Sequence, residues 1–304
     1  MLNITNQLIV SALFSLAGFV LAMALTPLYT FVAYKYKFWK KQKTASVTGE
    51  ALTVVNKLHA KKIARNIPTM AGIIGVIAVI IISVLLNLKR EQTWLPLAGL
   101  AGGAFIGLID DILNIWGSNR KDAGLRAPVK FAMIISLAGF LAWFFTFKLH
   151  FTSVMIPFIG NIEIGYWMVP LFIFAIVATS NAVNISDGLD GLAGGLLSAA
   201  FGAFGIIALV QNQHNLAVFC FTVLGALLAY LWFNVYPARF FMGDVGSLAL
   251  GAGLAIISIM LHKEWTLLLV GIIFVFETLS VILQVGSFKL TGKRIFKMSP
   301  IHHH

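Results

Sequence analysis

Aspartate side chains occur in only four short stretches of a chain that is otherwise largely apolar. The six aspartates are Asp110 and Asp111, Asp122, Asp187 and Asp190, and Asp244. A carboxylate at the end of an apolar segment costs free energy unless a cation or hydrogen-bond donors compensate it. Carboxylate oxygens are also preferred ligands of Mg²⁺, which keeps some of its waters and is often completed by substrate phosphates. The pattern therefore predicts a membrane enzyme with its metal chemistry at one bilayer surface.

The richest stretch contains two asparagines and two aspartates, Asn181, Asn184, Asp187 and Asp190. The last three follow one another at intervals of three, so a helix would place them along one face. If the neighbouring glycines open a turn instead, the same oxygens can still converge. An ordinary polar loop between two spans is the alternative. The long apolar runs on both sides favour a functional site.

Asp110 and Asp111 close an apolar run, and we expect each to have its own role. Neighbouring residues on a helix point about 100° apart. One carboxylate would face the site, while the other takes a cap or a basic partner. The alternative is that both mark a helix end at the membrane surface. Because the helix dipole disfavours acidic residues at a C-terminus, we favour the functional interpretation.

Asp244 opens the next apolar run after a short polar turn. Pro237 ends the preceding span, and Gly243 lets the backbone approach a ligand closely. A helix N-terminus favours negative charge, so helix capping is an alternative role for Asp244. Phe241 would stack on a base or, alternatively, anchor the chain at the membrane interface.

The elements that carry these residues are predicted to be membrane-spanning helices. The chain is 59% hydrophobic and 11% charged, with a mean hydropathy of +0.92, whereas soluble domains are about 25% charged. About 20 apolar residues cross a bilayer as a helix. Nine apolar runs are long enough: 8–32, 70–88, 94–113, 128–147, 166–184, 191–210, 216–233, 244–262 and 266–285. We therefore predict an all-α polytopic bundle in a single domain, 1–304, with the first run retained as a span.

Basic residues predict the orientation of this bundle. With the N-terminus outside, the outside segments hold only Lys89, Arg90, Lys148 and Lys263, and every other Lys and Arg lies inside. The positive-inside rule favours this arrangement, which places all six aspartates on the cytoplasmic side. The net charge of +11 then indicates anionic membrane lipid or a phosphorylated substrate rather than nucleic acid.

The polar stretches resemble the signature regions of the polyprenyl-phosphate N-acetylhexosamine-1-phosphate transferases, glycosyltransferase family 4. The resembling segments are 67–70, Asp110 and Asp111 with Gly124, Leu125 and Lys130, then 181–192, 234–247 and 289–304. The resemblance spans almost the whole chain. The triple histidine at the chain end is the most specific feature and resembles the phospho-N-acetylmuramoyl-pentapeptide branch. A truncated purification tag is the alternative for it.

The resemblance implies a reaction and a location. UDP-MurNAc-pentapeptide and undecaprenyl phosphate would give lipid I and UMP, with Mg²⁺ as cofactor, in peptidoglycan biosynthesis. The active site would face the cytoplasm from the bacterial plasma membrane. Members of the family have ten spans, so we expect this domain to lack a final transmembrane helix. A homodimer is left open.

The resemblance also implies residue roles. Asp187 and Asp244 would bind Mg²⁺. Asp110, accompanied by Asp111, would act as a base on the lipid phosphate, and Lys130 would lie in the catalytic cleft. The substrate contacts would be Thr69, Asn181, Asn184, Asp190, Asn234, Phe241, Gln284, His302, His303 and His304, with Phe241 stacking on uracil.

Three positions depart from the family pattern. Asn114 and Ala64 stand where lysines are usual, and Ala71 stands where glycine is common. These departures leave the proposed metal residues in place and change residues beside the substrate.

Two other functions fit the same residues. A sibling transferase would use another UDP-N-acetylhexosamine, against which the histidine tail argues. An ion-coupled transporter would also carry intramembrane carboxylates, but transport sites tend to lie near the bilayer midplane, and these aspartates lie at span ends.

Overall fold

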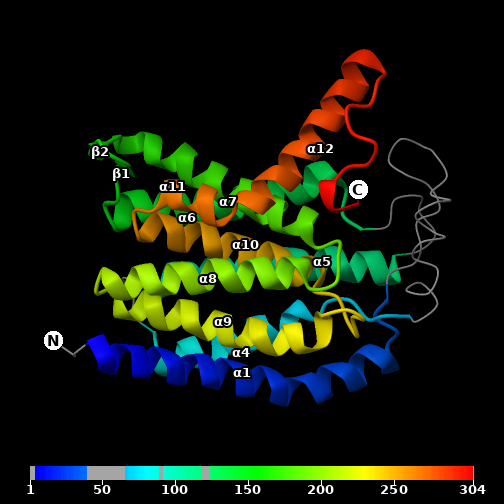
Figure 1. Ribbon diagram of the computed structural model, residues 1–304, viewed down its shortest axis with the longest axis horizontal. Coiled ribbons are helices and arrows are strands. Elements are labelled where there is room, and N and C mark those ends of the chain that lie inside the picture. Colours follow the sequence, from blue (N-terminus) through cyan, green and yellow to red (C-terminus); the bar gives the residue numbers. More distant parts are fainter. Residues whose placement is uncertain (1–3, 40–65, 89–91, 118–123, 304) are drawn as a thin grey trace.

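The computed structural model describes residues 4–39, 66–88, 92–117 and 124–303 of the chain. These residues form a helical bundle with one short hairpin (Figure 1). Its helices are α1 (Ile4–Lys35), α4 (Gly72–Leu86), α5 (Trp94–Trp116), α6 (Ala127–Lys148), α7 (Met168–Ser186), α8 (Leu192–Val210), α9 (His214–Asn234), α10 (Gly243–Met260), α11 (Glu264–Val270) and α12 (Ile272–Thr291). Short 3-10 turns form at Gly165–Trp167 and Ile301–His303.

The prediction of an all-α membrane bundle is confirmed. Within the described residues, eight helices are long and apolar enough to cross a membrane. The run 70–88 forms α4, whose 15 residues span about 22 Å, less than the usual hydrocarbon thickness of about 30 Å.

The ninth predicted span, 266–285, is not one continuous helix. It is divided into α11 and α12, which meet at Gly271. The Gly271 amide closes α11 by donating to the Leu267 carbonyl oxygen at 2.8 Å. Glycine costs helix stability because its backbone is the freest, so this is where the helix is easiest to interrupt. Beyond the break, α12 leans out of the bundle (Figure 1).

A β-hairpin joins α6 to α7 and was not predicted. Strands β1 (Ser153–Ile156) and β2 (Gly160–Glu163) pair antiparallel, with Ser153 opposite Glu163. The hairpin follows the C-terminal end of α6. It therefore lies at the end of the bundle away from Lys130, which is in the first turn of that helix.

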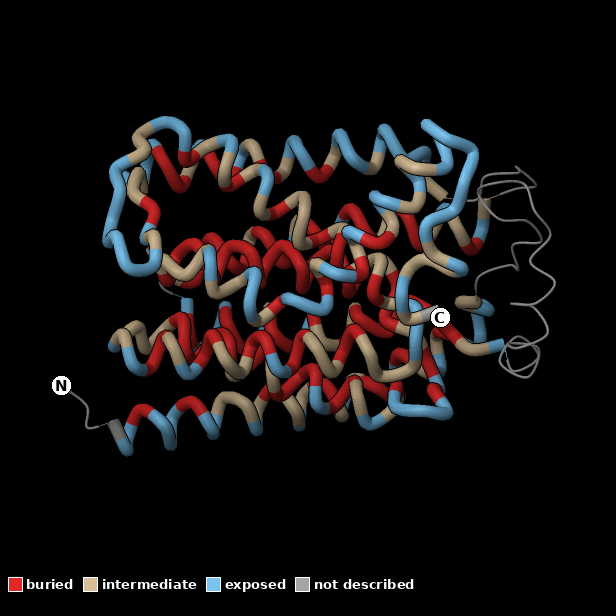
Figure 2. Tube along the Cα trace, turned by 45° about the horizontal axis from the view of Figure 1, so that its top comes forward, coloured by how far each residue is buried: buried red, intermediate tan, exposed pale blue. Residues whose placement is uncertain are grey.

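Helix α10 is the centre of the bundle, and its residues from Val245 to Met260 are buried. It packs chiefly against α5 and α7, and Figure 2 shows the buried residues concentrated in the middle of the bundle. Glycines permit the approach to α5: a Cβ added to Gly103 would lie 2.8 Å from the Leu248 carbonyl oxygen, and one added to Gly107 would collide with the Asp244 backbone. The close contact fixes the start of α10 beside the end of α5.

A pH-dependent stability difference is expected at Glu264, which begins α11 outside the eight long helices. Burial raises the pKa of the Glu264 carboxyl from 4.5 to about 7. For a carboxyl with a raised pKa, the contribution to folding stability is fully present below pH 4.5 and is lost as the pH rises through about 7. At the higher pH the carboxyl is charged, and folding must bury that charge. We expect Glu264→Gln to be more stable than the parent at pH 8 by about 1 kcal/mol, after discounting for partial exposure. At pH 5 the expected difference is near zero.

Thermal unfolding of both chains in detergent across this pH range measures the effect. Glu163→Gln, at an exposed hairpin position, is the matched control. A parent and variant whose difference does not change with pH would contradict the assignment.

Candidate active site

Lys130 bridges two aspartates that come from different helices. Its Nζ lies 3.3 Å from Asp110 Oδ2 and also donates to Asp244 Oδ2. Asp110 is near the C-terminal end of α5, Lys130 is in the first turn of α6, and Asp244 is in the first turn of α10. The Lys130 side chain is only 17% exposed. Within the part of the chain that the structure describes, Lys130 thus joins two carboxylates that would otherwise repel each other.

Backbone and amide donors fix the orientation of Asp110. Its Oδ1 accepts the Leu125 amide hydrogen at 2.7 Å, and Asn114 Nδ2 donates to its Oδ2 at 3.2 Å. Asn114 also packs directly against Gly124, whose φ of +103° suits glycine. The asparagine at the usual lysine position therefore keeps a contact with Asp110 but brings no positive charge.

Asp111 points to a different partner from its neighbour. It is fully buried, and its Oδ2 accepts the Val245 amide hydrogen at 3.0 Å, at the start of α10. A Cβ on Gly243 would lie 2.6 Å from the same oxygen. Asp111 therefore satisfies a free N–H at the α10 terminus from another helix, where negative charge is favourable. Asp244 is left to face Lys130.

The second polar stretch is a turn rather than a helical face. Asn184 is in α7, but that helix ends at Ser186, and Asp187 has non-helical angles of φ −78° and ψ 50°. The helical alternative is therefore wrong and the turn is right. Asn184 Nδ2 donates to Ser247 Oγ at 2.8 Å. This bond ties the segment that carries Asp187 to the helix that carries Asp244.

Asn234 and Asp190 join the two polar turns. Asn234 Oδ1 accepts the Gly191 amide hydrogen at 2.9 Å, and its Nδ2 donates to the Phe240 carbonyl oxygen at 2.9 Å. Asp190 Oδ2 accepts the Ala238 amide hydrogen at 3.0 Å. Asn234 is 2% exposed, so its amide organises the backbone in this structure. Asn181 bonds within its own helix, to the Val177 carbonyl oxygen.

The backbone segments that contain Thr69 and Phe241 are hydrogen-bonded to each other. The Phe241 amide donates to the Pro68 carbonyl oxygen at 2.8 Å, and the Ala71 amide donates to the Phe241 carbonyl oxygen at 3.0 Å. Thr69 is buried, and its carbonyl oxygen accepts the Tyr29 hydroxyl hydrogen. The backbone before α4 is thereby laid beside the turn before α10.

The chain end folds back along α12. Gln284 Oε1 accepts the Ile295 and Phe296 amide hydrogens at 3.1 and 2.9 Å, so this side chain serves the tail here. His302 reaches the second polar stretch, because a Cβ on Gly188 would collide with His302 Nε2. Ala64, Asp122, His304 and the His303 side chain lie outside the described residues.

Sequence reasoning missed Glu277, which is buried in α12 and contacts His302. A signal was available, because an acidic residue inside an apolar helix is expensive and is usually functional or paired.

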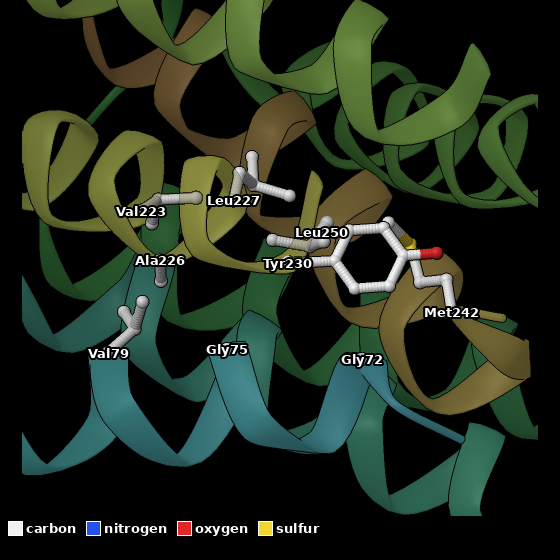
Figure 3. A pocket seen from close by; sticks show the side chains of 9 residues that line it. All are labelled: Gly72, Gly75, Val79, Val223, Ala226, Leu227, Tyr230, Met242 and Leu250. Atoms are coloured by element: carbon white, nitrogen blue, oxygen red, sulfur yellow. The ribbon is translucent and has the colours of Figure 1, made fainter. Parts of the chain in front are cut away.

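Two cavities differ in what they can hold. A void of about 10 Å³ lies between α4, α9 and α10 and is lined by Tyr230, Met242 and seven other residues (Figure 3). It has room for about one water. A groove of about 550 Å³ lies beside Lys130 on α5 and α6, lined by Ile106, Pro128, Val129, Ala132, Met133 and Ser136. Its volume is that of a ligand site, and its lining is largely apolar.

The residues also bear on whether a metal would fit. The described residues contain no group of three or more His, Cys, Asp or Glu arranged as a metal site. Mg²⁺ does not require such a group, since one or two carboxylates with waters and substrate phosphates suffice. The hydrogen bond between Asn184 and Ser247 links the segments of Asp187 and Asp244. Two carboxylates on linked segments fit such a minimal site.

Comparison with known proteins points to one family. Residues 93–262 match the model for glycosyl transferase family 4. The chain is 46% identical over 253 residues to a phospho-N-acetylmuramoyl-pentapeptide-transferase of Chloroflexus aurantiacus, covering 78% of this chain and 68% of that protein. For the Levilactobacillus brevis protein of the same name, identity is 46% over 252 residues, with 81% and 77% covered. For that of Clostridium perfringens it is 41% over 289 residues, with 94% and 85% covered.

Replacing Asn234 tests whether its role is structural. Asn234→Ala would leave the Gly191 amide and the Phe240 carbonyl oxygen without this partner. Each lost buried bond costs about 1–3 kcal/mol, so we expect a loss of about 2–4 kcal/mol and a clearly lower melting temperature. Asn181→Ala, at a bond within one helix, should lose less. An Asn234→Ala chain with parental stability and impaired nucleotide binding alone would show a direct contact instead.

Proposed function

Because the chain belongs to glycosyl transferase family 4 and, within it, to the phospho-N-acetylmuramoyl-pentapeptide transferases, we propose that it makes lipid I. In this reaction, phospho-N-acetylmuramoyl-pentapeptide passes from UDP-MurNAc-pentapeptide to undecaprenyl phosphate, and UMP leaves. The observation that carries the proposal is the 41% sequence identity to such an enzyme, in an alignment that covers 94% of this chain. The chain is accordingly a multi-pass membrane transferase.

The reaction demands compensation of negative charge. Both substrates are anionic, and more charge gathers on the phosphoryl group as it is transferred. Preorganised cations stabilise that charge most effectively where water is scarce. Lys130 is such a cation: it is mostly buried and is held between Asp110 and Asp244.

The nucleophile needs placement more than activation. A phosphate monoester has a second pKa of about 6, so it is largely ionised at neutral pH. Holding two reactants in the right geometry can contribute several kcal/mol. Asp110 is fixed by the Leu125 amide and Lys130, and we assign it to the lipid-phosphate end of the site. The apolar groove beside Lys130 would hold the first part of the polyprenyl chain.

We assign Asp187 and Asp244 as the protein ligands of Mg²⁺. When bound, the ion would offset the charge of the sugar-nucleotide diphosphate. Asn184, which links the two segments through Ser247, would hold the two carboxylates at a fixed position relative to each other. Asp190, His302 and Phe241 would lie on the nucleotide side.

The site is proposed to face the cytoplasm. Most Lys and Arg residues lie in the connecting segments that are predicted to share one side of the membrane with the polar turns. Basic residues favour the cytoplasmic side. The nucleotide substrate would reach the site from there.

A purified chain should release UMP when given UDP-MurNAc-pentapeptide, undecaprenyl phosphate and Mg²⁺. Release should require the lipid phosphate and should stop when the divalent cation is chelated. UDP-N-acetylglucosamine serves as the sibling substrate in a parallel reaction. A folded chain that releases UMP only with UDP-N-acetylglucosamine would identify a sibling transferase, and one that releases none with either would refute the proposal.

Replacing Asp244 tests the metal assignment. Asp244→Asn keeps the shape of the side chain but removes the charge that pairs with Lys130 and would hold Mg²⁺. We expect turnover to fall by at least about 100-fold, the scale seen when a preorganised electrostatic group is removed, with expression nearly unchanged. Glu163→Gln is the control. A near-normal rate, with a normal Mg²⁺ dependence, would show that Asp244 is not a ligand.

A further inference from the structure

Glu277 is a buried acid for which the reaction as described has no use. It lies in the second turn of α12, in a largely apolar part of the helix, and is 5% exposed. An acid at this depth is expensive unless it is paired. Its partner is in the tail, 25 residues further along the chain.

The Glu277 carboxylate contacts both the backbone amide and the imidazole ring of His302. Glu277 Oε1 and Oε2 accept the His302 amide hydrogen at 3.1 and 3.3 Å, and Oε2 lies 3.0 Å from His302 Nδ1. The His302 side chain is 4% exposed and that of Glu277 is 7% exposed. Because Glu277 contacts His302 at both the backbone amide and ring Nδ1, these contacts fix the orientation of the ring.

The fixed ring points at the second polar stretch. His302 Nε2, on the opposite side of the ring from Nδ1, lies against Gly188 at less than the distance a Cβ would need. Gly188 directly follows Asp187, so this contact brings the chain end to the turn that carries a proposed Mg²⁺ ligand. A side chain larger than glycine would push the ring away.

A second contact holds the same tail independently of Glu277. Gln284, two turns further along α12, accepts two tail amide hydrogens and donates to the Phe296 carbonyl oxygen at 3.2 Å. Gln284 therefore holds the tail at Ile295 and Phe296, where it begins to run back along α12, and Glu277 holds it at His302. Of these two residues, Glu277 is the one that contacts the His302 ring.

We propose that Glu277 is a positioning residue: its carboxylate holds His302 so that Nε2 stays at the Asp187–Gly188 turn, where the diphosphate of the sugar nucleotide would bind. The inference rests on the proposed function for the identity of that ligand. The carboxylate orients a histidine that acts on another group, as carboxylates orient histidines in metal sites, where losing the partner costs about 10–100-fold in affinity or activity.

The experiment separates positioning from general stability. Ile301 is exposed and neighbours His302, so a spin label on Ile301→Cys in a Cys220→Ser chain reports tail mobility. Glu277→Gln and Gly188→Ala are each added to the labelled chain. Glu163→Gln and Gly195→Ala are the matched controls, because Glu163 is exposed and a Cβ on Gly195 would meet nothing within 4 Å. Affinity for UDP-MurNAc-pentapeptide, KM for undecaprenyl phosphate and melting temperature are measured for every chain.

We expect Glu277→Gln to make the label mobile and to weaken sugar-nucleotide binding by about tenfold or more, with the KM for undecaprenyl phosphate changed by less than about twofold. Gly188→Ala should weaken the same binding although Glu277 is intact. An immobile label in Glu277→Gln would overturn the proposal, as would a mobile label with parental affinity or a Gly188→Ala chain that behaves like Gly195→Ala. A parent that binds no UDP-MurNAc-pentapeptide would refute the proposed function instead, and the label would still decide whether Glu277 positions the tail.

Discussion

The close approach of α5 to α10 is the constraint on which the site depends. At Gly107 there is no room for a Cβ against the Asp244 backbone, so the two helices touch main chain to main chain. This contact carries Asp110 and Asp111 to the start of α10, where Asp244 already stands. Like charges forced together need a cation, and Lys130 supplies one from the first turn of α6. Packing by small residues thus creates an electrostatic demand that the neighbouring helix meets.

The two walls of the site are held by different means. The wall built from α5, α6 and α10 is secured by core packing and by Asp111, which bonds the α10 terminus. The opposite wall consists of α12 and its tail, and α12 leans away from the bundle after Gly271 (Figure 1). This wall packs against α7, with Phe274 of α12 buried, and the polar contacts of Glu277 and Gln284 tie the tail to it. Core packing thus holds the first wall, whereas side-chain hydrogen bonds hold the tail in the second.

The sequence predicted the parts of this architecture that are set by composition and sharp local pattern. Long apolar runs have few alternatives in a membrane, so the sequence predicted the helical bundle and most of its long helices, and the acidic residues at their ends indicated a candidate site. Decisions between two nearly equal local structures were not accessible. At Gly271 and at Asp187 the local sequence is compatible both with a helix that continues and with one that ends, and a four-residue hairpin strand carries little signal. Asn234 organises the backbone by bonding the Gly191 amide, 43 residues away in the sequence, and the nearby Phe240 carbonyl oxygen. No spacing rule reveals such a pair of partners.

Asn114 and Lys130 contribute differently to the surroundings of Asp110. Asn114 gives Asp110 a hydrogen bond without a charge, so Lys130 is the cation that Asp110 and Asp244 share. Asn184 and Ser247 link this cluster to the segment that carries Asp187, a third carboxylate. A divalent cation bound by these carboxylates would offset part of the charge of an anionic diphosphate, so the proposed Mg²⁺ and the sugar nucleotide should favour each other's binding.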